Sequence, residues 1–192
     1  MTIRDIYKIK KFLPNDMLCG VVCSLVLMKL DYCNALLYNL NNNEINMLQA
    51  VQNAAIRLIS GGHKFDRIPI SPLFERYHWL RIRERVVFKL CLIVHKCVWG
   101  FAPDSLREKI VVSNPRTFNL VEREFTSVFG QRAFSRAGPK LWNCLPIKMR
   151  LEQDTSKFKK LLKSFLMTGA NLLYHRINMR WFGVSEYLFS II

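Results

Sequence analysis

The sequence predicts a mainly α-helical fold, with a helical hairpin, a long central helix and a small β-hairpin in the C-terminal half. Three observations lead to this prediction. Apolar residues recur at spacings of three and four along several long segments, which is typical of helices that bury one face. An asparagine run at residues 41–43 ends the first of these segments, and a glycine pair at residues 61–62 ends the second. After Pro115, apolar and polar residues alternate instead, as they do in a strand.

The helical hairpin is expected between residues 14 and 62. Pro14, Asn15 and Asp16 are suited to begin a helix, and a periodic apolar stripe continues from there to about Leu40. Its members are Leu18, Val21, Val22, Leu25, Met28, Tyr32, Ala35 and Leu36. A second stripe follows the asparagine run and consists of Ile45, Leu48, Val51, Ala55, Leu58 and Ile59. Because a short connection joins two long amphipathic segments, we expect the two helices to lie antiparallel.

The remaining elements are predicted in the C-terminal half. Residues 68–72 include two prolines, which favours an extended connector. Residues 83–99 are apolar on nearly every side, as expected for a central helix. The β-hairpin is expected within residues 116–129, where Phe125, Ser127 and Phe129 alternate with their neighbours. Residues 155–166 predict an amphipathic helix that Asp154 or Thr155 caps. Its apolar face consists of Phe158, Leu161, Leu162 and Phe165.

The charge of the chain favours a polyanionic partner. It has 29 basic and 14 acidic residues among 192, a net charge of +15. Such an excess favours RNA, DNA or an anionic membrane surface as a partner. A merely basic, solvated surface is the alternative. The 51% of apolar residues argues against a disordered chain.

The cysteines and the apolar segments bear on the compartment. None of the six cysteines forms a C-x-x-C pair, and most lie in apolar runs, where a free thiol packs as a small hydrophobe. No continuous apolar region follows the basic first dozen residues, so we expect an intracellular protein, nuclear or cytoplasmic and not secreted. The apolar segments 17–28 and 181–192 are shorter than the ~20 residues that span a bilayer, so a transmembrane helix is not expected.

Four blocks of sequence, in order, resemble one known family. They are LDYCNALLYNL at residues 30–40, LQAVQNAAIRLISG at 48–61, HWLRIRERVVFKLCLIVHKCVWGFAP at 78–103 and GQRAFSRAGPKLWNCLP at 130–146. Together they resemble the C-terminal part of the reverse transcriptase, an RNA-directed DNA polymerase, of non-LTR (LINE-type) retrotransposons. The resemblance covers roughly residues 3–166. It implies that residues 1–169 are a helical region equivalent to the thumb and extension that follow the catalytic palm. Residues 170–192 are then an unmatched apolar tail.

The resemblance implies a role in holding template RNA or a primer duplex, but the sequence lacks the residues for polymerisation. Nucleotidyl transfer needs clustered carboxylates that hold two divalent metals. No two aspartates are adjacent, and Asp31 beside Tyr32 lies in a helix-period segment with Cys33 in place of a second carboxylate. Cys91 and His95 are one helical turn apart, but two ligands do not make a tetrahedral metal site. We therefore expect no catalytic residue, metal, cofactor or small-molecule substrate.

Basic residues are the candidate functional residues. Phosphate contacts of the kind that lysine and arginine make give affinity without sequence choice. Arg132 and Arg136, four residues apart, are expected side by side if their segment is one helix. Trp79, Phe134 and Trp142 are interpreted as core residues, with base stacking as the alternative. The candidate nucleic-acid contacts are Arg81, Arg83, Arg85, Arg132, Arg136, Lys140, Lys157, Lys159, Lys160 and Lys163.

The sequence thus predicts a catalytically inactive remnant of a reverse transcriptase that binds RNA or DNA without sequence preference. Two alternatives stay open. The chain can be a translated pseudogene fragment with no role, or a membrane-surface protein that uses its basic helices and apolar tail. Exposed apolar surface also raises the prospect of self-association.

Overall fold

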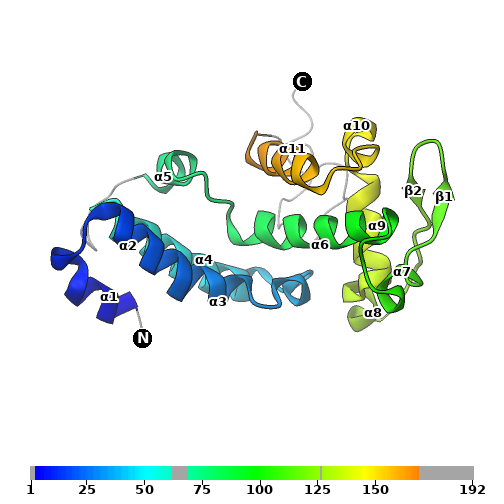
Figure 1. Cartoon of the computed structure of the whole chain (residues 1–192). Helices are drawn as coiled ribbons and strands as arrows, with labels where there is room; N and C mark the ends of the chain where they lie inside the picture. The colour runs from blue at the N-terminus through cyan, green and yellow to red at the C-terminus, as the bar shows by residue number, and fades with distance from the viewer. Residues whose placement is uncertain (1–2, 62–68, 126, 169–192) are drawn as a thin grey trace, which may run out of the picture. The chain divides into compact units, whose positions relative to one another are not determined.

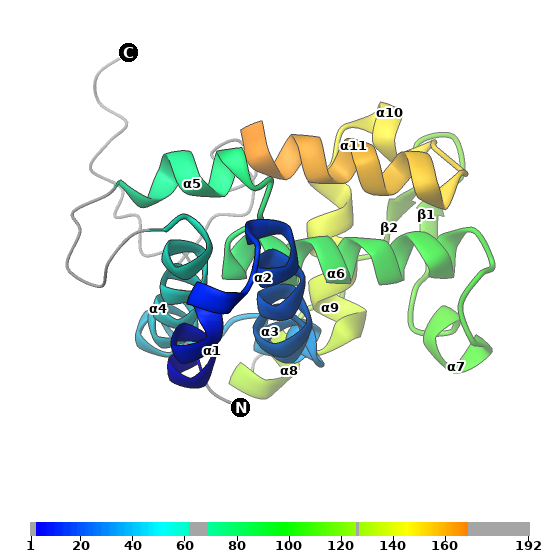
Figure 2. The ribbon, with the colours of Figure 1, turned by 60° about the vertical axis from the view of Figure 1, so that its left-hand side comes forward.

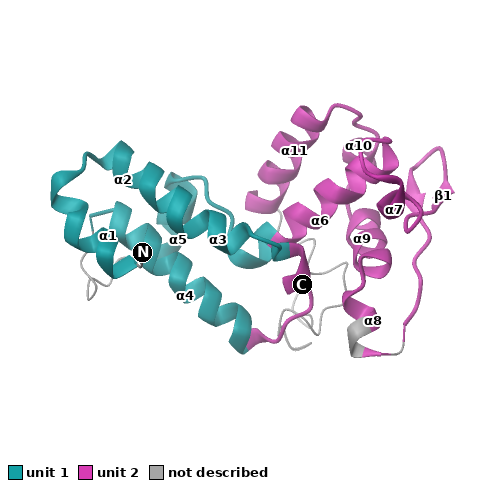
Figure 3. Cartoon of the chain, turned by 60° about the horizontal axis from the view of Figure 1, so that its bottom comes forward, with its two compact units in different colours: residues 1–34, 43–85 teal, residues 35–42, 86–192 magenta. Residues whose placement is uncertain are grey.

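The structure is a computed structural model that describes residues 3–61, 69–125 and 127–168. Helices dominate it, and one two-stranded antiparallel sheet lies in the C-terminal half (Figure 1). The predicted fold class is therefore confirmed. The chain forms two compact units (Figure 3). Unit 1 takes its described residues from 1–34 and 43–85, and unit 2 from 35–42 and 86–192. The sequence alone does not predict this division into two units.

Unit 1 is built around the predicted helical hairpin. Its elements are α1 (Ile3–Ile9), a 3₁₀ turn (Lys10–Phe12), α2 (Asn15–Val22), a π-helical turn (Cys23–Leu27), α3 (Met28–Asp31), α4 (Asn42–Ile59) and α5 (Ile70–Arg76). The α2–α3 segment and α4 lie alongside each other and run in opposite directions (Figures 1 and 3). Their shared core consists of Leu18, Val22, Val26, Leu27, Ala55, Ile56, Leu58 and Ile59, to which α5 adds Leu73 and Phe74.

The first helix ends earlier than the sequence predicts. It stops at Asp31 rather than near Leu40, because Tyr32 is extended and Cys33 has a positive φ of 51°. A separate 3₁₀ turn, Asn34–Leu37, follows. The predicted stripe holds as far as Leu25, which packs partly buried against the core, but it is wrong at Met28, Tyr32 and Leu36, which are 67%, 81% and 76% exposed. The π turn adds a residue to one turn of helix, and Val26 and Leu27 are buried there instead of Met28.

The other boundaries of unit 1 differ less from prediction. Gly61 ends α4 with a φ of 82°, as predicted, whereas Gly62 and Ile68 lie outside the described residues. The expected extended connector is wrong for residues 70–72, which form the first turn of α5. Pro72 is tolerated there because the first N–H groups of a helix have no partner within it.

Unit 2 surrounds α6 (Ile82–Val98), whose first turn belongs to unit 1. The later elements are α7 (Asp104–Arg107), β1 (Val112–Asn114), β2 (Asn119–Leu120), α8 (Val128–Arg132), α9 (Phe134–Asn143), α10 (Ile147–Arg150) and α11 (Thr155–Thr168). The predicted central helix is confirmed. Its buried residues in unit 2 are Val86, Val87, Leu90, Cys91, Val94, His95 and Cys97. In Figures 1 and 2, α11 runs beside α6.

The end of α6 shows why glycine is needed at position 100. Gly100 has a φ of 78°. The Phe101 N–H donates to the Lys96 carbonyl at 2.7 Å, and the Gly100 N–H donates to the Cys97 carbonyl at 3.4 Å. These two bonds form a Schellman motif, which satisfies the last carbonyls of the helix.

The β-hairpin lies a few residues before the predicted position. Val112 pairs with Leu120, and the turn at residues 115–118 is supported by an Arg116 N–H that donates to Asn114 Oδ1 at 2.9 Å. Phe125 and residues 127–129 are not a strand, so the predicted range of 116–129 is wrong there, and Thr126 lies outside the described residues. The Ser127 side chain instead accepts the Gly130 N–H at 3.0 Å and caps α8.

The block at residues 130–146 fixes the sheet to the helices of unit 2. Asn143 Nδ2 donates to the Leu120 carbonyl, and its Oδ1 accepts the Leu120 N–H, both at 2.9 Å. Trp142 Nε1 donates to the Phe118 carbonyl at 2.8 Å. A Cβ atom on Gly138 would lie 2.8 Å from Val94 Cγ2, so α9 approaches α6 closely at this point. Through these contacts α9 connects the β-hairpin to α6.

Candidate nucleic-acid interface

The candidate interface is the outer face of α11. Asp154 caps this helix, since its Oδ1 accepts the Ser156 N–H at 2.7 Å and its carbonyl accepts the Phe158 N–H. Of the two predicted caps, Asp154 is therefore the one used. Phe158, Leu162 and Leu166, at spacings of four, are 0%, 0% and 3% exposed. This apolar stripe orients the helix against the core of unit 2. The predicted apolar face is confirmed for Phe158 and Leu162 but wrong for Leu161, which is 45% exposed, whereas Leu166 is buried.

The four predicted lysines of α11 all lie on the solvent side. Lys157, Lys159, Lys160 and Lys163 are exposed, and α11 contains no acidic residue. We call these four residues the lysine face. Among the described residues, no hydrogen bond or ion pair occupies their ammonium groups. The face extends over about 9 Å of helix, because six residue steps rise ~1.5 Å each.

The short helix α10 adds one basic side chain before α11. Lys148 is exposed, whereas Arg150 is 8% exposed and hydrogen-bonds to Asn119 on β2. The sequence shows both as basic residues beside the block at 130–146. Only the structure separates them, because the partner of Arg150 lies 31 residues away.

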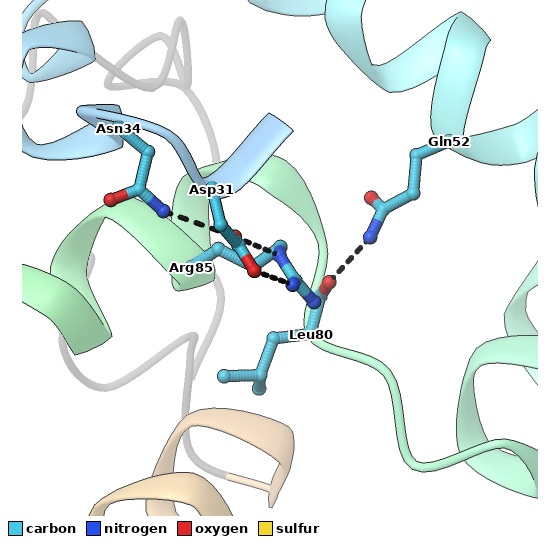
Figure 4. Close-up of polar contacts among 5 residues, drawn as sticks. All are labelled: Asp31, Asn34, Gln52, Leu80 and Arg85. Atoms are coloured by element: carbon cyan, nitrogen blue, oxygen red, sulfur yellow. Dashed lines mark hydrogen bonds and ion pairs between the residues drawn. The ribbon is translucent and has the colours of Figure 1, made fainter. Parts of the chain in front are cut away.

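Two of the predicted arginines of residues 81–85, Arg81 and Arg85, are engaged within unit 1. Arg81 Nη2 donates to Ser71 Oγ at 2.8 Å, and its guanidinium lies 5.0 Å from the centre of the Phe74 ring. Arg83 is half-buried and interacts within the chain. Arg85 makes a bidentate ion pair with Asp31, in which Nε donates to Oδ1 at 2.7 Å (Figure 4). The guanidiniums of Arg81 and Arg85 thus have structural partners, unlike the lysine face.

The Asp31 carboxylate is held in the same network. Asn34 Nδ2 donates to Asp31 Oδ1 at 3.2 Å, and nearby Gln52 Nε2 donates to the Leu80 carbonyl at 2.8 Å (Figure 4). The only carboxylate that imitates a polymerase motif in sequence therefore binds Arg85 in the structure.

Arg132, Arg136 and Lys140 are all half-buried. The expected side-by-side placement of Arg132 and Arg136 is wrong, because Ala133 is extended (ψ 138°) and separates α8 from α9. Arg136 Nη1 donates to the Phe125 carbonyl at 2.7 Å. Arg136 is therefore engaged within unit 2, whereas Arg132 Nε is buried without a hydrogen-bond partner among the described residues.

The aromatic residues near these arginines lie in or at the cores of their units. Trp142 is 0% exposed and Trp79 is 9% exposed, while Phe134 is half-buried. The interpretation of the two tryptophans as core residues is confirmed. Bases cannot stack on rings that the core already covers.

A buried histidine supports the packing of α11. His95 is 0% exposed, and its ring stacks on Phe158 with centroids 4.2 Å apart. Nε2 lies 2.8 Å from the Glu152 carbonyl oxygen. Because a carbonyl only accepts, Nε2 carries the proton. Nδ1 is buried without a hydrogen-bond partner among the described residues. Burial lowers the pKa of His95, although Glu152 and Asp154 oppose the shift.

Two buried thiols and one buried tyrosine have raised pKa values. Burial raises the pKa of Cys91 and of Cys97, so both stay protonated at neutral pH. Burial likewise raises the pKa of Tyr38 to about 12. Within residues 3–61, 69–125 and 127–168, no group of three or more histidine, cysteine or acidic side chains can hold a metal ion.

None of the described helices combines the length and hydropathy that crossing a membrane requires. The predicted apolar tail at residues 170–192 lies outside the described residues.

No protein-family model matches the chain, and comparisons with curated proteins and with solved structures return no match.

Proposed function

We propose that this chain binds RNA or DNA through phosphate contacts made by the lysine face of α11, without sequence preference and without polymerase activity of its own. The observation that carries the proposal is the lysine face itself. Four ammonium groups lie on one side of a helix that is fixed by a buried apolar stripe, and no acidic side chain interrupts them. Fixed cations that follow a helix axis suit a phosphate backbone.

The resemblance to the post-palm region of LINE-type reverse transcriptases supports the same proposal. A part that holds template or primer needs affinity for the backbone and no choice of base. The engagement of Asp31 by Arg85 and Asn34 supports the proposed lack of polymerase chemistry. Such a module acts in the cytoplasm or nucleus, where its RNA or DNA partner is found. Primer extension by the purified chain, with Mg²⁺ and a primed RNA template, would contradict this part of the proposal.

The binding test is a salt titration of a fluorescently labelled single-stranded RNA. Four phosphate contacts predict that the logarithm of the binding constant falls with the logarithm of salt concentration with a slope of about −3, since each contact contributes roughly 0.7 for single strands. Replacing Lys157, Lys159, Lys160 and Lys163 with glutamine should remove most of that slope. The effect should be the same for unrelated RNA sequences.

A matched control separates a local interface from total charge. Lys29, Lys89, Lys96 and Lys109 are also exposed, and their replacement with glutamine removes the same four charges. We expect this control variant to keep most of the slope. Equal losses in the two variants would show that affinity follows net charge and not the lysine face. A wild-type protein whose binding ignores salt would refute phosphate contacts altogether.

A further inference from the structure

A second exposed surface lies at the start of unit 1 and combines apolar with basic side chains. Phe12 is 74% exposed, Met17 is 59% exposed and Tyr7 is 48% exposed. They come from α1, the 3₁₀ turn Lys10–Phe12 and the first turn of α2. We call these three side chains the N-terminal apolar patch. All three lie within residues 7–17, and exposed apolar side chains that cluster mark interaction surfaces.

The segment that carries the patch is anchored to the core of unit 1. Ile6 of α1 is 1% exposed and Leu18 of α2 is 0% exposed, and Leu13 packs against the same core. Leu13 and Leu18 occupy the two positions of a hydrophobic staple around the start of α2. Phe12 and Met17 each precede one of these inward residues by one position. The fold therefore anchors this segment and leaves Phe12 and Met17 in solvent.

Basic side chains lie in the same segment as the patch, and one of them, Lys8, pairs with Asp5 at 3.9 Å. Arg4, Lys8 and Lys11 are exposed, and Lys10 is half-buried. The Lys11 ammonium lies 4.8 Å from the centre of the Phe12 ring, and the Lys10 ammonium lies 5.7 Å from that of Tyr7. Asp5 and Asp16 are the acidic residues of this segment, so four basic minus two acidic residues give residues 3–17 a net charge of +2.

Two kinds of polyanion suit cations beside exposed rings: a single-stranded nucleic acid and the surface of an anionic membrane. Two observations favour the membrane. Met17 has no ring on which a base can stack, yet it partitions readily into the bilayer interface. In addition, no charged residue lies between Met17 and Met28, so α2 carries no charged side chain after Asp16.

We propose that the N-terminal apolar patch docks unit 1 on anionic phospholipid bilayers. Phe12 and Met17 enter the interface between headgroups and acyl chains, and Tyr7 lies at headgroup level, where its hydroxyl stays hydrated. The four basic residues bind lipid phosphates and anionic headgroups. This mode of binding is peripheral and needs no membrane-spanning helix. It does not depend on the lysine face of α11.

The test is sedimentation of the full chain with vesicles of phosphatidylcholine containing 30% phosphatidylserine. We expect Phe12→Ala with Met17→Ala to reduce the partition coefficient at least tenfold, because two large apolar side chains no longer enter the interface. The matched control replaces Leu36 and Met47, which are 76% and 72% exposed elsewhere, with alanine. This control variant should bind as the wild type does. Replacing Lys8 and Lys11 with glutamine should weaken binding to anionic vesicles several-fold.

Three results would overturn the proposal. One is no binding of the wild type to the anionic vesicles. Another is binding that survives the loss of both Phe12 and Met17, which would assign the membrane contact to another part of the chain. The third is a tenfold loss of single-stranded RNA affinity in the Phe12 and Met17 variant without loss of vesicle binding, which would make the patch a nucleic-acid surface. Far-UV circular dichroism of each variant confirms that the fold is kept.

Discussion

The buried His95 makes the stability of unit 2 depend on pH. In the folded protein Phe158 and Trp142 lie against the ring. If Nδ1 were protonated, its N–H would find no hydrogen-bond acceptor among the described residues. Protonation would therefore place a charge in an apolar core, which is costly. In the unfolded chain the imidazole binds its proton with an ordinary pKa near ~6.5.

The sign of the effect follows from this difference. Below pH ~6.5 the unfolded state binds one more proton than the folded state, so the free energy of unfolding falls as the pH falls. The stabilisation is fully present above pH ~6.5 and decreases until the folded His95 itself titrates at its lowered pKa. One proton sets the limit for the slope, at about 1.4 kcal/mol per pH unit.

The assay is urea unfolding between pH 7.5 and 4.5, compared with a His95→Phe variant. Phenylalanine keeps a ring against Phe158 but cannot bind a proton. It loses the bond to the Glu152 carbonyl, so we expect the variant to be less stable by ~1–2 kcal/mol at pH 7.5. The free energy of unfolding of the variant should change less with pH than that of the wild type, and the difference in slope should correspond to about one proton. His78→Asn is the control, because His78 is exposed and asparagine tolerates its positive φ of 52°. Identical slopes in wild type and His95→Phe would refute the reasoning.

Three further changes test single interactions by urea unfolding at pH 7.5. Asp154→Ala should cost about 1 kcal/mol, because it removes the cap of α11, and Ser156→Ala should cost much less. Asn143→Ala should cost ~2–3 kcal/mol, because it leaves the N–H and carbonyl of buried Leu120 unpaired; a cost below ~0.5 kcal/mol would contradict that role. A double-mutant cycle of Arg85→Met and Asp31→Asn should give a coupling energy of ~1–2 kcal/mol, since the arginine side chain is only 17% exposed; additive effects would show that the pair contributes nothing.

The parts that the sequence predicts correctly are those governed by local periodicity. The predicted Phe158 and Leu162 orient α11 and leave four lysines outside, so the helix and its basic face follow from spacing, whereas Leu166 is buried in place of the predicted Leu161. The same holds for α6 and for the glycine that ends it. These features depend on neighbours within one or two helical turns.

The errors arise where a distant residue or an irregular turn decides the structure. The π turn at Cys23–Leu27 shifts the buried face by one residue, which no spacing rule reveals. Arg85 looks like a phosphate ligand in sequence, but its partner Asp31 lies 54 residues away. The sequence of residues 125–129 alternates as in a strand, yet Ser127 caps a helix. The strand lies earlier, at Leu120, whose N–H and carbonyl both bond to the side chain of Asn143.

Phe158 stacks on His95 and belongs to α11, the helix that carries the lysine face. The pH dependence of stability therefore bears on the proposed function. For most basic proteins, affinity for polyphosphates rises as the pH falls, because surface histidines gain charge. Here acid pH should loosen the packing that holds α11, so that the four lysines no longer share one face. At constant salt, we therefore expect RNA affinity of the wild type to fall once the pH drops below the lowered pKa of His95.

The variant His95→Phe separates this effect from ordinary titration. Its α11 packing does not depend on a proton, so its RNA affinity should stay constant or rise over the same pH range. Fluorescence anisotropy with the labelled RNA measures both proteins under identical conditions. If the affinity of wild type and variant rises in parallel towards pH 5, then the packing of Phe158 on His95 does not control the lysine face. In that case α11 presents its charges independently of the core beneath it, and the binding proposal would rest on local helix geometry alone.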